Sequence, residues 1–329
     1  MSKKVLILHH TDLDGAMSGG VCGYYCQKLG YEPTYKLYNY GYPIKPENFK
    51  GFDLVFAVDI SFHETDPWVY QYLGRQGKLI WIDHHKSAIE FKSKHPEYFE
   101  GVIGTQKIGK GACELTWEYL FPDSKTPRLI QYLSAYDVWD KERFDWAEVT
   151  EPIQYGCRLE YGISAKDLCN YLGLLELGLT DYLEELRQSG KNILKYIEKN
   201  LSGKIKNYGS FIPEFNVEGV GTYRILLLNT NEFSSKSFEG MYDPRFYDIM
   251  APYCICPREG EPGKFDVRMS FYTDKPDIDV SKVAEIFGGG GHSGAAGCAI
   301  DLATLQTILE CSMSLKEYDN WLWYTGKKK

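Results

Sequence analysis

The chain has 329 residues, of which 43% are hydrophobic and 25% charged, and its formal net charge is −8. This length predicts one large or two ordinary globular domains with a substantial hydrophobic core. The acidic balance argues against long duplex nucleic acid as a partner, because that partner needs many lysine and arginine contacts. No apolar run reaches the ~18 residues of a membrane span, and the N-terminal run is too short for a signal peptide. We therefore expect no membrane association.

Nine cysteines are scattered along the chain without a CxxC pair. An odd number at irregular spacing argues against a disulfide framework and predicts a reducing, cytoplasmic compartment. Cys254 and Cys256 are spaced so that they could share a metal. Two strand residues that point the same way are the simpler interpretation.

Strand-like and helix-like segments alternate through the first half of the chain. Residues 4–9 form a continuous apolar run, which is typical of a buried parallel strand. The elements expected after it are helix 15–29, strands 34–38 and 53–58, helix 66–74, strand 78–82, and helices 112–120 and 128–136. This alternation predicts a parallel sheet with helices on both faces.

The second half has a different order of elements. Residues 181–201 are amphipathic with helical spacing, which predicts a connector helix. Expected beyond it are strands 223–228, 247–256 and 265–272, helix 280–287, a glycine-rich turn, strand 297–300 and helix 302–313. We thus expect an α/β chain made of a parallel-sheet domain, a helical connector and a smaller C-terminal α/β domain, at residues 1–180, 181–208 and 209–315.

Carboxylates and imidazoles follow the predicted strands of the first half. In parallel sheets, ligands gather at the carboxyl ends of the strands. Carboxylate and imidazole are the ligand types that suit Mn²⁺, and paired divalent ions suit phosphate-ester hydrolysis. The set consists of His10, Asp12 and Asp14 in HHTDLDG, Asp59 in AVDIS, Asp83, His84 and His85 in IDHHK, and Asp137 in SAYDVWD.

Each member of this set also has a structural alternative. Asp12 and Asp14 lie where a strand turns into a helix, and alone they would be read as helix caps. Asp137 alone would be read as the end of a helix or a turn. The metal interpretation is favoured because the residues occur together.

A glycine-rich segment, FGGGGHSGAAG, covers residues 287–297. Its glycines disfavour folding entropically, so their use points to backbone N–H groups that approach an anion or a ligand. A flexible linker is the alternative, but the segment lies between an amphipathic helix and a strand. We therefore expect substrate contact at Gly289, Gly290, Gly291 and His292.

The strings HTDLDG, VDIS, DHH, SAYD and GGGGHSGAAG together resemble the DHH phosphoesterases that carry the DHH-associated C-terminal domain. They extend from residue 10 to 297, nearly the whole chain. The resemblance implies Mn²⁺-dependent hydrolysis of a phosphoester, with Mg²⁺ or Co²⁺ as other possible metals. It implies an N-terminal domain that holds two metals and a C-terminal domain that holds the far end of the substrate.

Roles for single residues follow from the same resemblance. It implies one metal on His10, Asp12 and Asp59, with Asp59 bridging to a second metal on Asp14, His84 and Asp137. His85 would contact the substrate phosphate, and Asp83 would orient a ligand histidine. The single residue between His10 and Asp12 is similar to the RecJ and nano-RNase branch. Many members have an arginine where this chain has Tyr272, which could stack a base instead.

The expected activity is a two-metal phosphodiesterase that cuts short oligoribonucleotides or dinucleotides to mononucleotides. One alternative is a phosphoesterase for cyclic dinucleotides or for 3′-phosphoadenosine 5′-phosphate, because the metal chemistry is common to all of these. A non-catalytic nucleotide or metal sensor is the alternative of another class. The oligomeric state stays open, with a homodimer as one option.

Overall fold

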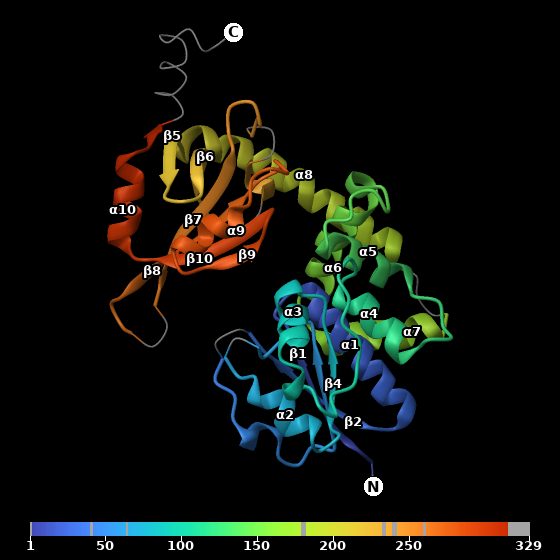
Figure 1. The fold of residues 1–329 in the computed structure, drawn as a ribbon. Helices are drawn as coiled ribbons and strands as arrows, with labels where there is room; N and C mark the ends of the chain where they lie inside the picture. Colours follow the sequence, from blue (N-terminus) through green and yellow to red (C-terminus); the bar gives the residue numbers. More distant parts are fainter. Residues whose placement is uncertain are drawn as a thin grey trace. The chain divides into compact units, whose positions relative to one another are not determined.

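The structure is a computed structural model that describes residues 2–39, 42–63, 65–178, 182–231, 235–238, 242–258 and 261–314. The chain divides into two compact units, residues 1–194 and 195–329. Within the residues described, no helix combines the length and the apolar character that crossing a membrane requires. Figure 1 labels most of the helices and strands of both units.

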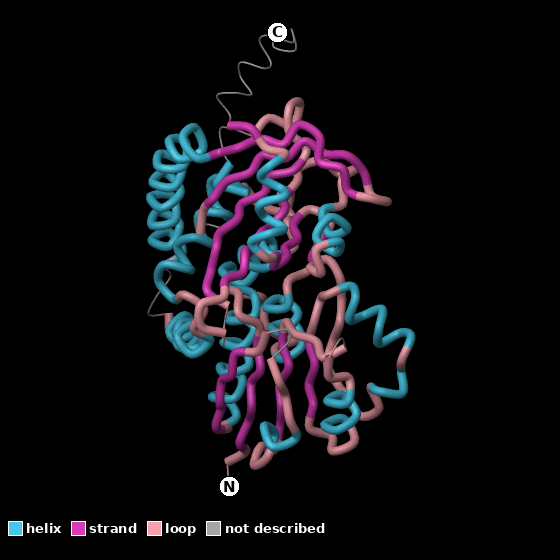
Figure 2. The backbone as a smooth tube through the Cα atoms, turned by 90° about the vertical axis from the view of Figure 1, so that its left-hand side faces the viewer, coloured by secondary structure: helices cyan, strands magenta, loops and turns pink. Residues whose placement is uncertain are grey.

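A parallel sheet of four strands organises the first unit, in the order β2-β1-β3-β4. Figure 2 shows these strands running side by side. The two central strands β1 and β3 are apolar along almost their whole length, which suits strands that are covered on both faces. The strands are β1 (Lys4–His9), β2 (Glu32–Leu37), β3 (Leu54–Val58) and β4 (Leu79–Ile82).

Helices cover both faces of this sheet, as the alternation of segments predicts. Val5 and Ile7 pack into one core with helices α1, α4, α5, α6 and α7. Leu6 and Leu8 pack into another core, to which α2 and α3 contribute buried side chains. The helices are α1 (Leu13–Leu29), α2 (Trp68–Gly74), α3 (Lys86–Lys94), α4 (Ala112–Leu120), α5 (Arg128–Asp137), α6 (Glu151–Tyr161) and α7 (Ala165–Glu176).

Small residues let helix α1 lie close against α7. A Cβ atom built on Gly19 would lie 3.0 Å from the Cβ of Ala165, and one on Gly20 would lie 3.0 Å from the Cβ of Leu168. The close approach explains the small residues on one side of this helix. Helices α3, α6 and α7 were missing from the elements expected from sequence.

A long helix, α8 (Leu183–Tyr208), follows the first unit, and the division between the two units falls within it. The amphipathic stretch 181–201 therefore does form a helix, although residue 181 lies outside the described residues. The domain boundaries expected from sequence stay a prediction.

A sheet of seven strands forms the second unit, in the order β11-β5-β6-β7-β8-β10-β9. Only β6 and β7 pair in parallel; the other described pairs are antiparallel. The elements are β5 (Gly209–Val217), β6 (Gly221–Asn229), β7 (Ile249–Pro257), β8 (Phe265–Tyr272), α9 (Val280–Ile286), β9 (Gly290–His292), β10 (Ala295–Ile300), α10 (Leu302–Glu310) and β11 (Met313–Ser314).

The glycine-rich segment is partly a strand, whereas the sequence predicted only a turn. Gly290–His292 pairs with Ala295–Gly297 as a hairpin, so strand β10 begins earlier than the predicted 297. A Cβ on Gly289 would lie 2.1 Å from the carbonyl oxygen of Gly297, which only glycine avoids. Close backbone approach thus explains at least one of the four glycines.

Candidate metal centre

Three neighbouring strands of the first unit deliver polar side chains to one edge of the sheet. His10 directly follows β1, Asp59 follows β3, and Asp83 and His84 follow β4. These strands are adjacent and parallel, so their carboxyl ends lie at the same edge. This arrangement is the one that gathers ligands in open parallel sheets.

Asp12 both caps a helix and faces a histidine. It is the N-cap of α1, where its Oδ1 accepts a hydrogen bond from the backbone N–H of Gly15 at 2.8 Å. Its Oδ2 lies 2.7 Å from Nδ1 of His10. The capping and ligand interpretations of Asp12 are therefore compatible, because each uses a different oxygen.

Asp14 lies in the first turn of α1 and joins two helices. Its carboxylate accepts hydrogen bonds from the backbone N–H groups of Ala112 at 2.6 Å and Cys113 at 3.0 Å. These groups belong to the N-terminus of α4, where a negative charge is favourable. Oδ2 of Asp14 also lies 3.9 Å from Nε2 of His84.

Asp59 and His84 lie at the centre of the cluster. Oδ1 of Asp59 is 3.2 Å from Nε2 of His84, and its Oδ2 is 3.7 Å from Nδ1 of His10. Asp59 has a φ of +58°, which is uncommon for a residue other than glycine. A buried carboxylate held in such a backbone conformation is typical of a functional site.

Asp83 organises the two histidines that follow it. Its Oδ1 accepts hydrogen bonds from the backbone N–H of His84 at 2.8 Å and from that of His85 at 3.3 Å, and it lies 2.7 Å from Nδ1 of His85. Asp83 is fully buried. It therefore fixes the ring of His85, the predicted phosphate contact, whereas the resemblance implied that Asp83 orients a histidine that binds metal.

Three overlapping groups of ligand atoms result, and within each the atoms lie within 4.8 Å of one another. Asp59 and His84 each belong to two groups, so they link the set. The last residue of α5, Asp137, joins through a distance of 3.3 Å between its Oδ2 and Nε2 of His84. The groups are His10, Asp12 and Asp59; Asp59, His84 and His85; and Asp14, His84 and Asp137.

Burial and mutual repulsion shape the charges in this cluster. Burial first, and then the neighbouring carboxylates, raise the pKa values of Asp59 and Asp137 well above their usual range. Burial and the charge of Asp12 also raise the pKa of Asp14. Burial lowers the pKa of His84, which favours the neutral imidazole that metals bind.

This cluster fits divalent metal ions. Oδ2 of Asp59 is buried and accepts no hydrogen bond from any described residue. A buried acceptor without a partner costs free energy, and so do carboxylates that repel one another. A divalent cation would satisfy the oxygen and offset the repulsion, and the donor set of carboxylates and imidazoles suits Mn²⁺ or Zn²⁺ more than Ca²⁺. Which residue binds which ion stays a prediction.

The predicted substrate residues of the second unit lie on neighbouring strands. Ala295 of β10 pairs with Tyr272 of β8 on one side and with His292 of β9 on the other. Paired residues of adjacent strands present their side chains on the same face. The structure thus places Tyr272 and His292 on either side of Ala295, with β10 between their strands, and their contact with substrate stays a prediction.

One hydrogen-bond network, around Glu114, was not predicted from the sequence. Glu114 is buried, and both of its carboxylate oxygens receive hydrogen bonds at 2.7 Å from the guanidinium of Arg143. Oγ of Ser134 donates to the same carboxylate at 2.7 Å and accepts from the N–H of Gly111. Burial alone would raise the pKa of Glu114, but these hydrogen bonds lower it below its usual value.

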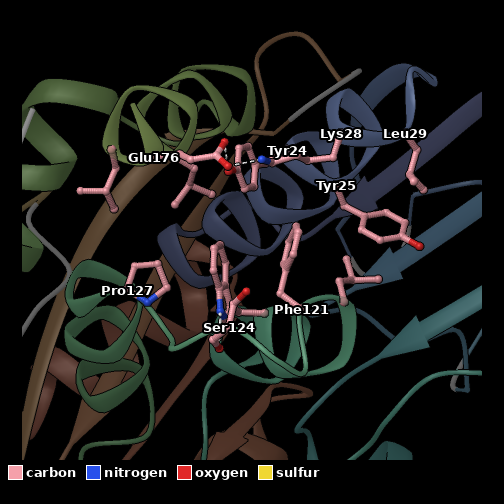
Figure 3. A pocket seen from close by; sticks show the side chains of 12 residues that line it. Tyr24, Tyr25, Lys28, Leu29, Phe121, Ser124, Pro127 and Glu176 are labelled. Atoms are coloured by element: carbon pink, nitrogen blue, oxygen red, sulfur yellow. Dashed lines mark hydrogen bonds and ion pairs between the residues drawn. The ribbon is translucent and has the colours of Figure 1, made fainter. Parts of the chain in front are cut away.

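A hollow of about 500 Å³ lies elsewhere in the first unit, between α1, α4 and α7 (Figure 3). Tyr24 and Lys28 line it from the C-terminal half of α1, whereas the cluster lies at the N-terminus of that helix. The hydroxyl of Tyr24 donates to Glu176 at 2.5 Å, and Lys28 pairs with the same carboxylate. The charged groups that line this hollow are thus paired with each other, and none belongs to the metal cluster.

Comparisons with known proteins give two curated relatives, and no family model matches the chain. Uncharacterized protein R106 of Acanthamoeba polyphaga mimivirus is 27% identical over 224 residues, which cover 67% of this chain and 47% of that protein. Oligoribonuclease NrnB of Bacillus subtilis strain 168 is 22% identical over 258 residues, which cover 75% of this chain and 59% of that protein. The chain spans about half the length of these relatives.

Among solved structures, the DHH domain of a member of a family of ribosomal proteins resembles this chain. The match covers 96% of this chain and 86% of the other, with a TM-score of 0.55 and 17% sequence identity. This likeness establishes the fold. The α/β class predicted from the sequence is confirmed.

Proposed function

We propose that the chain is a member of the DHH phosphoesterase family and acts as a two-metal phosphodiesterase for short oligoribonucleotides or dinucleotides. The observation that carries this proposal is the cluster at the strand ends, where Asp59 and His84 each belong to two groups of ligand atoms. Shared ligands are what a pair of closely spaced ions requires.

The ligand assignment is part of the proposal. His10, Asp12 and Asp59 would hold one ion, and Asp14, Asp59, His84 and Asp137 the other. When bound, such ions polarise a phosphoryl oxygen and lower the pKa of water. Mn²⁺ is the proposed metal because two imidazoles accompany the carboxylates.

The protein's own residues have separate tasks around this cluster. His85 is about one-fifth exposed at its side chain, so it can reach a substrate phosphate. Burial alone would lower the pKa of His85, but the hydrogen bond to Asp83 raises it above the usual value. His85 is therefore suited to carry positive charge against a phosphoryl oxygen, while Asp83 holds its ring in place.

The substrate class rests on several observations together. The net charge of −8 disfavours long duplex nucleic acid. One relative at 22% identity is named an oligoribonuclease. In the second unit, Gly289, Gly290, Gly291 and His292 would contact the distal nucleotide, and Tyr272, on the far side of β10, could stack a base.

The direct test is hydrolysis with Mn²⁺ of RNA from two to about ten nucleotides, run beside cyclic dinucleotides and 3′-phosphoadenosine 5′-phosphate. Preference for the shortest RNAs, with mononucleotide products, would support the proposal. Cleavage of only a cyclic or bisphosphorylated nucleotide would assign a signalling or salvage phosphoesterase. Metal binding without turnover of any of these substrates would indicate the sensor.

Thermal unfolding should reveal the metal site independently of activity. The pKa values of Asp59, Asp14 and Asp137 are raised in the folded protein, so their ionised forms destabilise the metal-free fold as pH rises through these values. Mn²⁺ needs the same ionised forms and competes with protons. We expect saturating Mn²⁺ to raise Tm more at pH 7.5 than at pH 5.5. Calorimetry at the two pH values measures this, and an equal rise at both would contradict it.

His292→Ala should separate nucleotide binding from the chemistry. His292 lies in the second unit, whereas the predicted metal ligands lie in the first. We expect the variant's KM for a dinucleotide to be about ten-fold higher than that of the wild type, because one charged or polar contact is lost. Hydrolysis of bis-(p-nitrophenyl) phosphate, which lacks a nucleotide, should keep its rate. Steady-state kinetics on both substrates measure the difference, and equal losses would argue against a distal binding role.

A further inference from the structure

Three aromatic rings lie nearly parallel in the segment that follows and includes the end of α5, where Asp137 joins the metal cluster. The ring centroids of Tyr136 and Trp146 are 5.3 Å apart with planes at 11°, and those of Trp139 and Trp146 are 5.5 Å apart at 18°. Tyr136 and Trp139 are 6.1 Å apart at 27°. Tyr136 directly precedes Asp137 and Trp139 follows it by two residues, so the rings flank a predicted metal ligand. We call these three residues the aromatic platform.

One member of the platform, Trp139, is exposed, unlike the tryptophans that serve packing. Trp139 has 45% of its surface exposed, whereas Trp81 is fully buried and Trp117 is 7% exposed. A ring placed only for packing would lose free energy through such exposure. An exposed indole two residues from a predicted metal ligand is instead suited to contact a ligand.

The backbone of Trp139 is held in an unfavourable conformation. Its φ is +55°, which is a genuine outlier for a bulky side chain. Turn hydrogen bonds hold it there, from the N–H of Trp139 to Tyr136 at 3.2 Å and from the N–H of Asp140 to Ala135 at 2.9 Å. Such conformations persist where the surrounding structure enforces them, and they cluster at active sites and ligand-binding segments.

Charged groups complete and anchor the platform. Nζ of Lys141 lies 4.8 Å from the ring centroid of Trp139 and 5.6 Å from that of Trp146. The paired hydrogen bonds from Arg143 to buried Glu114 fasten the same segment to α4. The platform thus combines ring faces, a cation and a fixed position, which is the combination that binds single-stranded nucleic acid.

We propose that the aromatic platform stacks the nucleobase of the nucleotide whose phosphate is cut, through the exposed face of Trp139. The assignment rests on the proposed function and names a base-binding subsite within the first unit. Stacking is tolerant of sequence because every base has a π face, so this subsite should bind all four bases. Lys141 would lie near the backbone of the same nucleotide.

Trp139→Ala tests the platform with three substrates and Mn²⁺: a ribodinucleotide, the same dinucleotide with one base removed, and bis-(p-nitrophenyl) phosphate. For the intact dinucleotide we expect KM to rise about 5- to 150-fold, the range measured for loss of one stacked base. The penalty should vanish for the analogue that lacks the stacked base, and the generic ester should be unaffected. Trp139→Phe should recover most of the loss, and Tyr72→Ala, a similarly exposed ring on α2, should behave as wild type.

Binding of the dinucleotide ApA to the metal-free protein, followed by tryptophan fluorescence, separates the two proposals. Weaker binding to the Trp139→Ala variant by the same factor supports the platform, even if the wild-type protein hydrolyses nothing. Failure of hydrolysis alone would therefore overturn the proposed function and leave the platform supported. Unchanged binding and unchanged KM in the Trp139→Ala variant would overturn the platform.

Discussion

Asp59→Asn should reduce phosphodiester hydrolysis by at least about 10³-fold, the upper range for loss of one group that stabilises developing charge. Asp59 is the carboxylate that we propose to bridge two ions, because its Oδ1 lies 3.2 Å from Nε2 of His84 and its Oδ2 lies 3.7 Å from Nδ1 of His10. Asparagine keeps the shape of the side chain but removes the charge. Steady-state hydrolysis of bis-(p-nitrophenyl) phosphate with Mn²⁺ measures the loss.

The fold should survive this substitution and even gain stability without metal. Burial and neighbouring carboxylates raise the pKa of Asp59, so its ionised form is unfavourable in the metal-free protein at neutral pH. We therefore expect Tm without metal to stay equal or rise, while the increase caused by Mn²⁺ becomes smaller. Asp123→Asn, at an exposed carboxylate outside the cluster, serves as the control. Near-normal hydrolysis by the Asp59→Asn variant would refute the assignment of Asp59.

Arg143→Met should lower the free energy of unfolding at pH 7 by about 2–3 kcal/mol. The estimate is below that for a fully buried pair because the Arg143 side chain is 27% exposed. Removal of the guanidinium leaves the buried carboxylate of Glu114 with a hydrogen bond from Ser134 and with the cation of Lys110, whose Nζ lies 3.6 Å from Oε1 of Glu114. Urea unfolding followed by circular dichroism measures the change.

The loss of stability in the Arg143→Met variant should depend on pH. The folded-state pKa of Glu114 is lowered, so the ion pair stabilises the protein above the unfolded-state pKa, and that stability is lost as pH falls through the folded-state value. The deficit of the Arg143→Met variant should therefore shrink in acid. Combination with Glu114→Gln should recover most of the loss, and Arg128→Met, at an exposed arginine, should change stability by less than about 0.5 kcal/mol. A deficit independent of pH would contradict the ion-pair explanation.

Local sequence predicted the part of the site that depends on strand ends. Each apolar run of the first half marks a strand, and His10, Asp59 and Asp83 follow those runs directly. Because parallel strands end at one edge of a sheet, their proximity could be inferred without knowing the strand order. The bounds of helices α4 and α5 were also predicted nearly to the residue, because the apolar residues of each helix recur at helical spacing.

Long-range partners could not be predicted in this way. The N–H groups of Ala112 and Cys113 reach Asp14 across nearly a hundred residues, and nothing in the spacing of either segment indicates it. The glycine hairpin was predicted only as a turn because glycine carries no strand propensity. The aromatic platform had one visible signal in the sequence, which is that Tyr136, Trp139 and Trp146 all lie within ten residues of Asp137. Only the structure shows that these three rings are nearly parallel.

The most direct test of the central proposal is a Mn²⁺ titration of metal-free protein, with hydrolysis of a ribodinucleotide measured at each point. If the cluster is a two-metal phosphodiester site, mononucleotides will appear only with metal, and bound Mn²⁺ will reach two ions per chain as the rate saturates. If two ions bind and no ester is cut, or if hydrolysis proceeds in the presence of a chelator, the cluster is not the catalytic centre.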